Sequence, residues 1–267
     1  MKHERIQLPG CVMDTYIPAL TTAPGVQRPS IVICPGGGYQ HLSDREAEPV
    51  ALVFAAMGFN AFVVWYRLAP NRHPAALHDV ASAVAWVRGH AQEFSGDPDA
   101  IAVAGFSAGG HAAGSLGVRW HDAELMAQAG LTAAQAKPNA MVLCYPVITG
   151  GEFAHRGSFV NLTGSEDMAV HESYSLDTLV STQTPPTFLW HTFEDGAVPV
   201  ENTLLMASAL RRAGVLTEAH IFPHGGHGLA LAMPLTSTSP EQNIPECAAW
   251  PEMAARFLRD VLGKQMS

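Results

Sequence analysis

Charged residues are scarce in this chain: Asp, Glu, Lys and Arg make up 15% of its 267 residues, whereas hydrophobic residues make up 48%. Such a composition supports a large buried core and excludes intrinsic disorder. Basic residues are the scarcer of the two signs, with 15 Lys and Arg against 24 Asp and Glu and a formal net charge of −9. Because an acidic surface repels phosphate backbones and anionic lipids, we expect neither a nucleic acid nor a membrane as partner.

Long apolar runs are also absent. No uncharged run reaches the roughly 20 residues that a helix needs to cross a bilayer. The N-terminal sequence MKHERIQLPG lacks the apolar segment of a secretory signal peptide. We therefore expect a cytoplasmic protein.

Cysteine is infrequent, and its spacing fits no metal or redox motif. The four cysteines are scattered, with no CxxC pair among them: Cys11, Cys34, Cys144 and Cys247. This argues against a zinc site, and in a reducing compartment it also argues against disulfides. Cys34 and Cys144 lie in apolar runs, so we expect both to be buried thiols.

Short apolar runs alternate with helical patterns along the chain. Their unbroken apolarity is typical of strands covered on both faces, and the runs are SIVIC (30–34), AFVVWY (61–66), IAVAG (101–105), AMVLCY (140–145), TFLWH (187–191) and EAHIF (218–222). Helices are predicted between them at 46–57, 75–92, 108–118, 200–213 and 248–262. This alternation predicts an α/β fold, a mostly parallel central sheet flanked by helices, in a single domain over residues 1–267.

Residues 147–186 interrupt this rhythm, since they form a long, polar and weakly periodic stretch. A connection of that length is usually a binding loop or lid. We interpret it as a lid-like insertion over the carboxyl ends of the strands, where ligands bind in such sheets.

Ser107 is the candidate nucleophile. It lies in Gly105-Phe106-Ser107-Ala108-Gly109, which follows an apolar run and precedes a helical stretch. G-x-S-x-G in this context predicts a sharp turn that holds the serine hydroxyl above the sheet edge, with small residues letting strand and helix approach. A Gly-rich turn could instead bind phosphate, but the chain has neither the Lys-Ser/Thr of a P-loop nor the acidic ribose partner of a dinucleotide site.

The first apolar run ends in Pro35-Gly36-Gly37-Gly38-Tyr39. Consecutive glycines leave backbone N–H groups unshielded and able to converge on one point, as an oxyanion hole requires. The alternative is a flexible turn. We expect Gly37 and Gly38 to donate to the oxyanion together with the N–H of Ala108.

Two carboxylates and two histidines follow the last two runs. Glu194 and Asp195 come after TFLWH, and His224 and His227 lie in the Gly-rich segment PHGGHG after EAHIF. The order Ser, then acid, then His is that of a nucleophile–base–acid triad on this kind of sheet. A metal cluster of His220, His224 and His227 is disfavoured, because no carboxylate or cysteine set completes it.

Five segments together carry a family resemblance: ICPGGGY, YRLAP, GFSAGGHAAG, PPTFLWHTFEDGAVPVEN and IFPHGGHG. With them the chain resembles the small acetyl-esterase or carbohydrate-esterase branch of the α/β-hydrolases, near the hormone-sensitive-lipase-like enzymes. The match starts at about the third strand, which puts the insertion after the sixth strand.

The resemblance implies specific roles. Its D-x-x-V-P-V motif places the triad acid at Asp195 and not at Glu194, and its final histidine is His227 and not His224. Tyr39 and the insertion would shape the substrate pockets. The implied reaction is hydrolysis of short acyl esters, often acetyl groups on sugars such as xylo-oligosaccharides, without metal or cofactor.

The expected partner is thus a small-molecule ester. The sequence does not decide whether the chain forms a homo-oligomer. Paired carboxylates for glycoside cleavage are not visible in the sequence. Three alternatives remain: a peptidase on the same fold, an arylformamidase on that fold, or a non-catalytic ligand-binding homologue.

Overall fold

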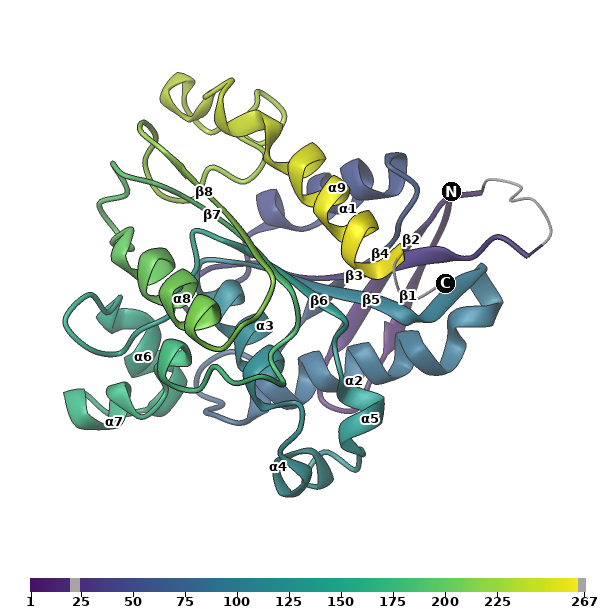
Figure 1. Ribbon diagram of the computed structural model, residues 1–267, viewed down its shortest axis with the longest axis horizontal. Helices are drawn as coiled ribbons and strands as arrows, with labels where there is room; N and C mark the ends of the chain where they lie inside the picture. Colours follow the sequence, from purple (N-terminus) through teal and green to yellow (C-terminus); the bar gives the residue numbers. More distant parts are fainter. Residues whose placement is uncertain (20–24, 264–267) are drawn as a thin grey trace.

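Eight strands form one sheet in the order β1-β2-β4-β3-β5-β6-β7-β8 (Figure 1). The computed structural model describes residues 1–19 and 25–263. The strands are β1 (Lys2–Gln7), β2 (Val12–Ile17), β3 (Arg28–Cys34), β4 (Asn60–Trp65), β5 (Gly96–Phe106), β6 (Ala140–Cys144), β7 (Thr187–Thr192) and β8 (Thr217–Phe222).

Strands β3 to β8 run parallel, whereas β1 and β2 form an antiparallel edge. The six apolar runs predicted as strands are confirmed as β3 to β8. Strands β1 and β2 were not among the predicted strands. β1 (KHERIQ) is almost wholly polar, and in β2 (VMDTYI) Asp and Thr interrupt the apolar residues, so neither has the continuous apolar run by which the parallel strands were recognised.

Helices cover both faces of the sheet. They are α1 (Glu48–Ala56), α2 (Ala75–His90), α3 (Ala108–Arg119), α4 (Ala123–Ala127), α5 (Ala133–Ala136), α6 (Arg156–Thr163), α7 (Met168–Glu172), α8 (Glu201–Arg212) and α9 (Trp250–Gly263). Short 3₁₀ turns lie at Asp44–Glu46, Ala91–Phe94, Leu176–Thr178, Pro240–Gln242 and Cys247–Ala249. Helices α1 and α9 pack on one face, and α2, α3 and α8 on the other (Figure 1). The five predicted helices are confirmed as α1, α2, α3, α8 and α9.

Two apolar layers separate these helices from the sheet. One contains Val80 and Leu116 with Val103 of the sheet, and the other contains Phe54 and Trp250. Cys34 and Cys144 are fully buried, as predicted. In the described residues, no helix combines the length and apolarity needed to cross a bilayer.

The predicted insertion occupies the connection between β6 and β7. It contains the short helices α6 and α7 and the 3₁₀ turn Leu176–Thr178, which the weak periodicity did not reveal. Helices α4 and α5, in the connection from α3 to β6, were also not predicted. Each of these four helices has eight residues or fewer, too short for a periodic pattern to stand out.

Candidate active site

Ser107 stands on the turn between β5 and α3 with a backbone φ of 54° and ψ of −120°. A positive φ is unfavourable for a residue with a Cβ, so the surrounding contacts must hold it. The Ser107 N–H donates to the carbonyl of Cys144, and its own carbonyl accepts from Val147. The strained elbow predicted from the sequence is therefore present.

Gly109 shows why this turn requires small residues. A Cβ at this position would lie 2.1 Å from the carbonyl oxygen of Cys34 at the end of β3. No side chain fits such a gap, so α3 can begin this close to β3 only with glycine here. The close approach also brings the nucleophile beside the Gly-rich loop that follows β3.

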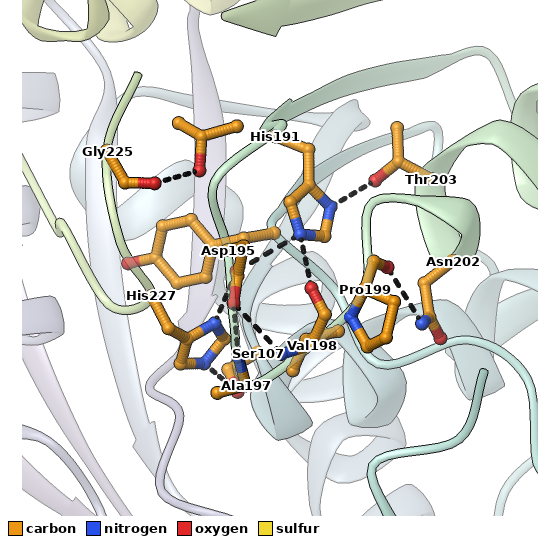
Figure 2. A network of polar contacts seen from close by, with 12 residues as sticks. Ser107, His191, Asp195, Ala197, Val198, Pro199, Asn202, Thr203, Gly225 and His227 are labelled. Carbon is orange, nitrogen blue, oxygen red and sulfur yellow. Dashed lines mark hydrogen bonds and ion pairs between the residues drawn. The ribbon is translucent and has the colours of Figure 1, made fainter. Parts of the chain in front are cut away.

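His227 and Asp195 complete a chain of hydrogen bonds with Ser107. The Ser107 Oγ lies 2.8 Å from Nε2 of His227, and Nδ1 of His227 lies 2.6 Å from Oδ2 of Asp195. Figure 2 shows the imidazole of His227 joined by dashed lines to Asp195 and to Ser107. The structure thus brings together the three residues assigned to the triad, from loops after β5, β7 and β8.

Asp195 is held in a closely defined environment. Its Oδ1 accepts from the N–H groups of Ala197 and Val198 at 3.0 and 2.9 Å, and its Oδ2 is also 3.1 Å from Nε2 of His191. Burial alone would raise the pKa of Asp195, but hydrogen bonds from His191 and His227 and the charge of His227 hold that pKa well below its usual range. Asp195 is therefore ionised when it orients His227.

His191 has a defined tautomer. Its Nε2 lies 3.0 Å from the carbonyl oxygen of Val198, which can only accept, so Nε2 carries the hydrogen. Its Nδ1 then accepts from the hydroxyl of Thr203 at 2.8 Å (Figure 2). His191 is fully buried and is not placed to act as the base for Ser107. It supports Asp195 instead, which sequence reasoning did not identify.

Glu194 and His224 pair with each other and not with the triad. The Glu194 Oε1 lies 3.0 Å from Nδ1 of His224, and its Oε2 accepts from the N–H of Gly225 at 3.0 Å. The bond from His224, with that from Gly225, lowers the pKa of Glu194. Both side chains are largely exposed. This pair braces the two loops at the surface.

Gly37 and Gly38 lie beside Ser107 and line the same cavity. Gly37 has φ of 131°, and a Cβ there would lie 2.2 Å from the carbonyl oxygen of His41. Within the described part of the chain, the N–H groups of Gly37, Gly38 and Ala108 donate no hydrogen bond to the protein. These three N–H groups are thus available to a ligand, as an oxyanion hole requires.

Tyr39 lies away from the position that sequence analysis gave it. Its side chain is 3% exposed, and its hydroxyl donates to Nδ1 of His111 at 2.9 Å. The Nε2 of His111 donates to the carbonyl of Tyr174. Residues 36–38, after β3, form the glycine loop. Tyr39 packs against His111 and is not among the residues that line the cavity beside Ser107.

A cavity of about 410 Å³ opens beside the nucleophile. Polar side chains dominate its wall: Gln40, His41, Ser43, Arg45, Glu46, Ser107, His155, Asn161 and His227. His155 and Asn161 come from the insertion, and Asn161 Nδ2 donates to the carbonyl of Gly38 at 2.8 Å. The insertion therefore forms one wall of the site, a placement that its length suggested but its residues did not specify.

His155 presents a donor to this cavity. Its Nδ1 accepts from the N–H of Ser158 at the start of α6, so the hydrogen is on Nε2. Burial, followed by the nearby His227, lowers the pKa of His155 and keeps the ring neutral. No protein group in the described residues accepts from its Nε2.

Comparison with family models matches residues 13–210 to the family BD-FAE. Among curated proteins, endo-1,4-beta-xylanase B of Butyrivibrio fibrisolvens is 36% identical over 212 residues, covering 78% of this chain and 33% of that protein. The acetylxylan esterase of Xylanibacter ruminicola is 32% identical over 206 residues, covering 74% of this chain and 40% of that protein. The chain thus spans about a third to two fifths of these curated relatives.

A solved structure matches over nearly the whole chain. It is the acetyl ester-xyloside bifunctional hydrolase from Caldicellulosiruptor lactoaceticus, which is 39% identical with a TM-score of 0.78. The alignment covers 94% of this chain and 88% of the other.

Proposed function

From the premise that the chain belongs to the BD-FAE family and has the α/β-hydrolase fold, we propose that it is a serine carboxylic ester hydrolase. It removes short acyl groups, acetyl above all, from small acetylated substrates such as xylo-oligosaccharides. The observation that carries this proposal is the unbroken hydrogen-bond chain from Ser107 through His227 to the ionised Asp195.

The geometry supports acyl transfer through an acyl-enzyme. The Ser107 Oγ attacks the ester carbonyl while Nε2 of His227 accepts its proton, and Asp195 stabilises the resulting imidazolium. The N–H groups of Gly37, Gly38 and Ala108 bind the oxyanion. His227 then protonates the leaving alcohol, and water enters by the same steps to release the carboxylic acid and restore Ser107.

The cavity supports a polar alcohol side. Its wall carries amide, imidazole and guanidinium groups, and His155 Nε2–H is an unused donor suited to a sugar hydroxyl or ring oxygen. The names of the relatives, an acetylxylan esterase and an acetyl ester-xyloside hydrolase, point to the same class of substrate. Glycoside cleavage is not part of the proposal. It needs two carboxyl groups at the bond, and Glu46 is the single carboxylate among the described residues lining this cavity.

Labelling and turnover test the enzymatic claim. A fluorophosphonate should label the parent protein at Ser107 but not Ser107→Ala, and the variant should lose hydrolysis of p-nitrophenyl acetate by at least about a thousandfold. Turnover within tenfold of the parent would contradict the assignment of the nucleophile. A parent protein that is never labelled and never turns over would favour a ligand-binding role.

A substrate panel tests the specificity claim. We expect kcat/KM to fall from acetyl and butyryl to palmitoyl p-nitrophenyl esters, and acetylated xylo-oligosaccharides to be cleaved. Preference for p-nitroanilides would favour a peptidase, and preference for N-formyl aryl amides an arylformamidase. The cytoplasmic location expected from the sequence stays a prediction.

A further inference from the structure

The 3₁₀ turn Asp44–Glu46 lies between the glycine loop and the loop that carries His227. Gly36, the first glycine of the former, is bound to this turn through both of its backbone polar groups. Its N–H donates to Oε2 of Glu46 at 2.8 Å, and its carbonyl accepts from the N–H of Ser43 at 3.0 Å. A Cβ on Gly36 would lie only 3.0 Å from Cβ of Ser107, so the backbone of this anchored residue passes close beside the nucleophile.

The second oxygen of Glu46 extends the connection to the other loop. The hydroxyl of Tyr145 donates to Oε1 at 2.7 Å and itself accepts from the N–H of Ala230 at 2.9 Å. The Tyr145 ring also packs edge-on against the imidazole of His227, with centroids 5.2 Å apart. One carboxylate thus joins the backbone of the glycine loop to the segment that follows His227.

Arg45, the neighbouring residue, also binds the segment that follows His227. Its Nη2 donates to the carbonyl of Gly228, directly after His227, and to Oε1 of Gln242, each at 2.9 Å, and its Nε donates to the carbonyl of Thr236. Among the described residues, no carboxylate forms an ion pair with this guanidinium. Its hydrogen bonds therefore serve to hold the loop.

Glu46 is an unusual group to find in this position. It is 4% exposed and lines the cavity with Ser107 and His227. Burial raises its pKa, whereas hydrogen bonds from Tyr145 and Gly36 and the charges of His227 and Arg45 act in the opposite direction. A buried carboxyl group is costly unless its oxygens are satisfied. Here one oxygen accepts from the glycine loop, and the other accepts from Tyr145, which in turn binds the segment after His227.

We propose that Glu46 and Arg45 are positioning residues that fix the glycine loop and the loop that carries His227 relative to each other. Tyr145 links Glu46 to the segment after His227 through its hydroxyl. The inference rests on the proposed esterase function, because it concerns the alignment of the oxyanion N–H groups with the base. Catalytic geometry must be held within a fraction of an ångström, so loosening either loop should slow the chemical step more than it weakens substrate binding.

Glu46→Gln, Glu46→Ala and Tyr145→Phe test this inference in the full chain. Asp14→Asn is the matched control, because Asp14 is 3% exposed and accepts from Arg5 and Trp65 on the antiparallel side of the sheet, outside the cavity. We expect kcat for p-nitrophenyl acetate to fall about tenfold in Glu46→Gln and Tyr145→Phe and about a hundredfold in Glu46→Ala. KM should stay within threefold, and fluorophosphonate labelling should slow in parallel with kcat.

The control separates positioning from stability. Asp14→Asn should lower the melting temperature by as much as Glu46→Gln but leave kcat within twofold of the parent. Equal effects of the two amide variants on kcat, or a parent-like kcat in folded Glu46→Ala, would overturn the inference, as would failure of all three site variants to fold. Arg45→Met should lower kcat and couple non-additively with Glu46→Gln; full additivity would remove Arg45 from the proposal.

The same assays distinguish this inference from the proposed function. If the parent neither hydrolyses p-nitrophenyl acetate nor reacts with the fluorophosphonate, the esterase proposal fails, and the positioning role fails with it. If the parent does both and the Glu46 and Tyr145 variants match it, only the positioning role is wrong.

Discussion

The Asp195–His227 pair and the Glu194–His224 pair lie on the same two loops, and each joins a carboxylate to Nδ1 of a histidine. The exposed fractions of their side chains differ, at 0% and 24% for Asp195 and His227 against 57% and 73% for Glu194 and His224. Their connections differ too: His227 continues to Ser107. A carboxylate–histidine contact is therefore not enough to define an acid–base pair.

Burial and further partners make the difference between the two pairs. Asp195 receives two backbone N–H bonds and a second histidine, so its position and charge are fixed before substrate binds. Glu194 faces solvent, where an ion pair is screened and contributes little.

The largest contrast is expected from removing one charge at each pair. Asp195→Asn should lower kcat by about three to four orders of magnitude, because the amide favours the wrong tautomer of His227 and cannot stabilise imidazolium. Glu194→Gln should change kcat less than about threefold, since the exposed amide can still accept from Gly225. Both should be assayed on p-nitrophenyl acetate, with folding checked by thermal melts. If Glu194→Gln is the more damaging of two folded variants, the acid is assigned to the wrong residue.

An intermediate loss of activity is expected on substitution of His191. The exposed Glu194–His224 pair has no second histidine in the corresponding position. His191→Asn cannot reach Asp195 and should lower kcat about tenfold with little change in KM, because one hydrogen bond to a charged group is lost. His191→Gln keeps a donor near the position of Nε2 and should retain more activity. Steady-state kinetics of the two variants give the comparison. Equal losses would show that His191 fills space and does not orient Asp195.

The smallest effect concerns stability and pH. The pKa of Asp195 lies well below its value in the unfolded chain, about 3.9. Between those two values the unfolded state binds more protons, so the free energy of unfolding rises with pH, and the stabilisation is complete above about pH 5. From pH 5 down to pH 3, the parent should lose about 1 kcal/mol more than Asp195→Asn in urea unfolding. The pH dependence of stability in Glu194→Gln should follow that of the parent closely. Parallel curves of unfolding free energy against pH for the parent and Asp195→Asn would show that folding does not lower the pKa of Asp195.

The sequence predicted what depends on short segments. Unbroken apolar runs gave the six parallel strands, and the elbow around Ser107 was found because a sharp strand–helix turn restricts nearby residues to small ones. The two N-terminal strands were not located, since neither has the continuous apolar run by which the other six were recognised. Tyr39 was expected at the substrate, yet it packs behind the glycine loop against His111, because burial of its ring next to α3 was not visible in the chain.

The features that the sequence did not reveal depend on hydrogen bonds between residues far apart in the chain. The link from Glu46 to Tyr145 spans 99 positions, and that from Arg45 to Gly228 spans 183. Neither has a local pattern, because a polar residue in a turn looks the same whether it faces water or a distant loop. His155 is similar, since its role at the cavity depends on how α6 lies against Gly38.

By itself the sequence determined the six parallel strands, the elbow and the chemical types available at the sheet edge, because local sterics and apolar continuity act over a few residues. The family motif assigned the acid and the base to Asp195 and His227, but only the tertiary structure buries that carboxylate, brings that histidine to Ser107, and decides which polar side chains hold the two loops together. Those outcomes depend on desolvation and on hydrogen bonds between segments that meet only when the sheet has assembled.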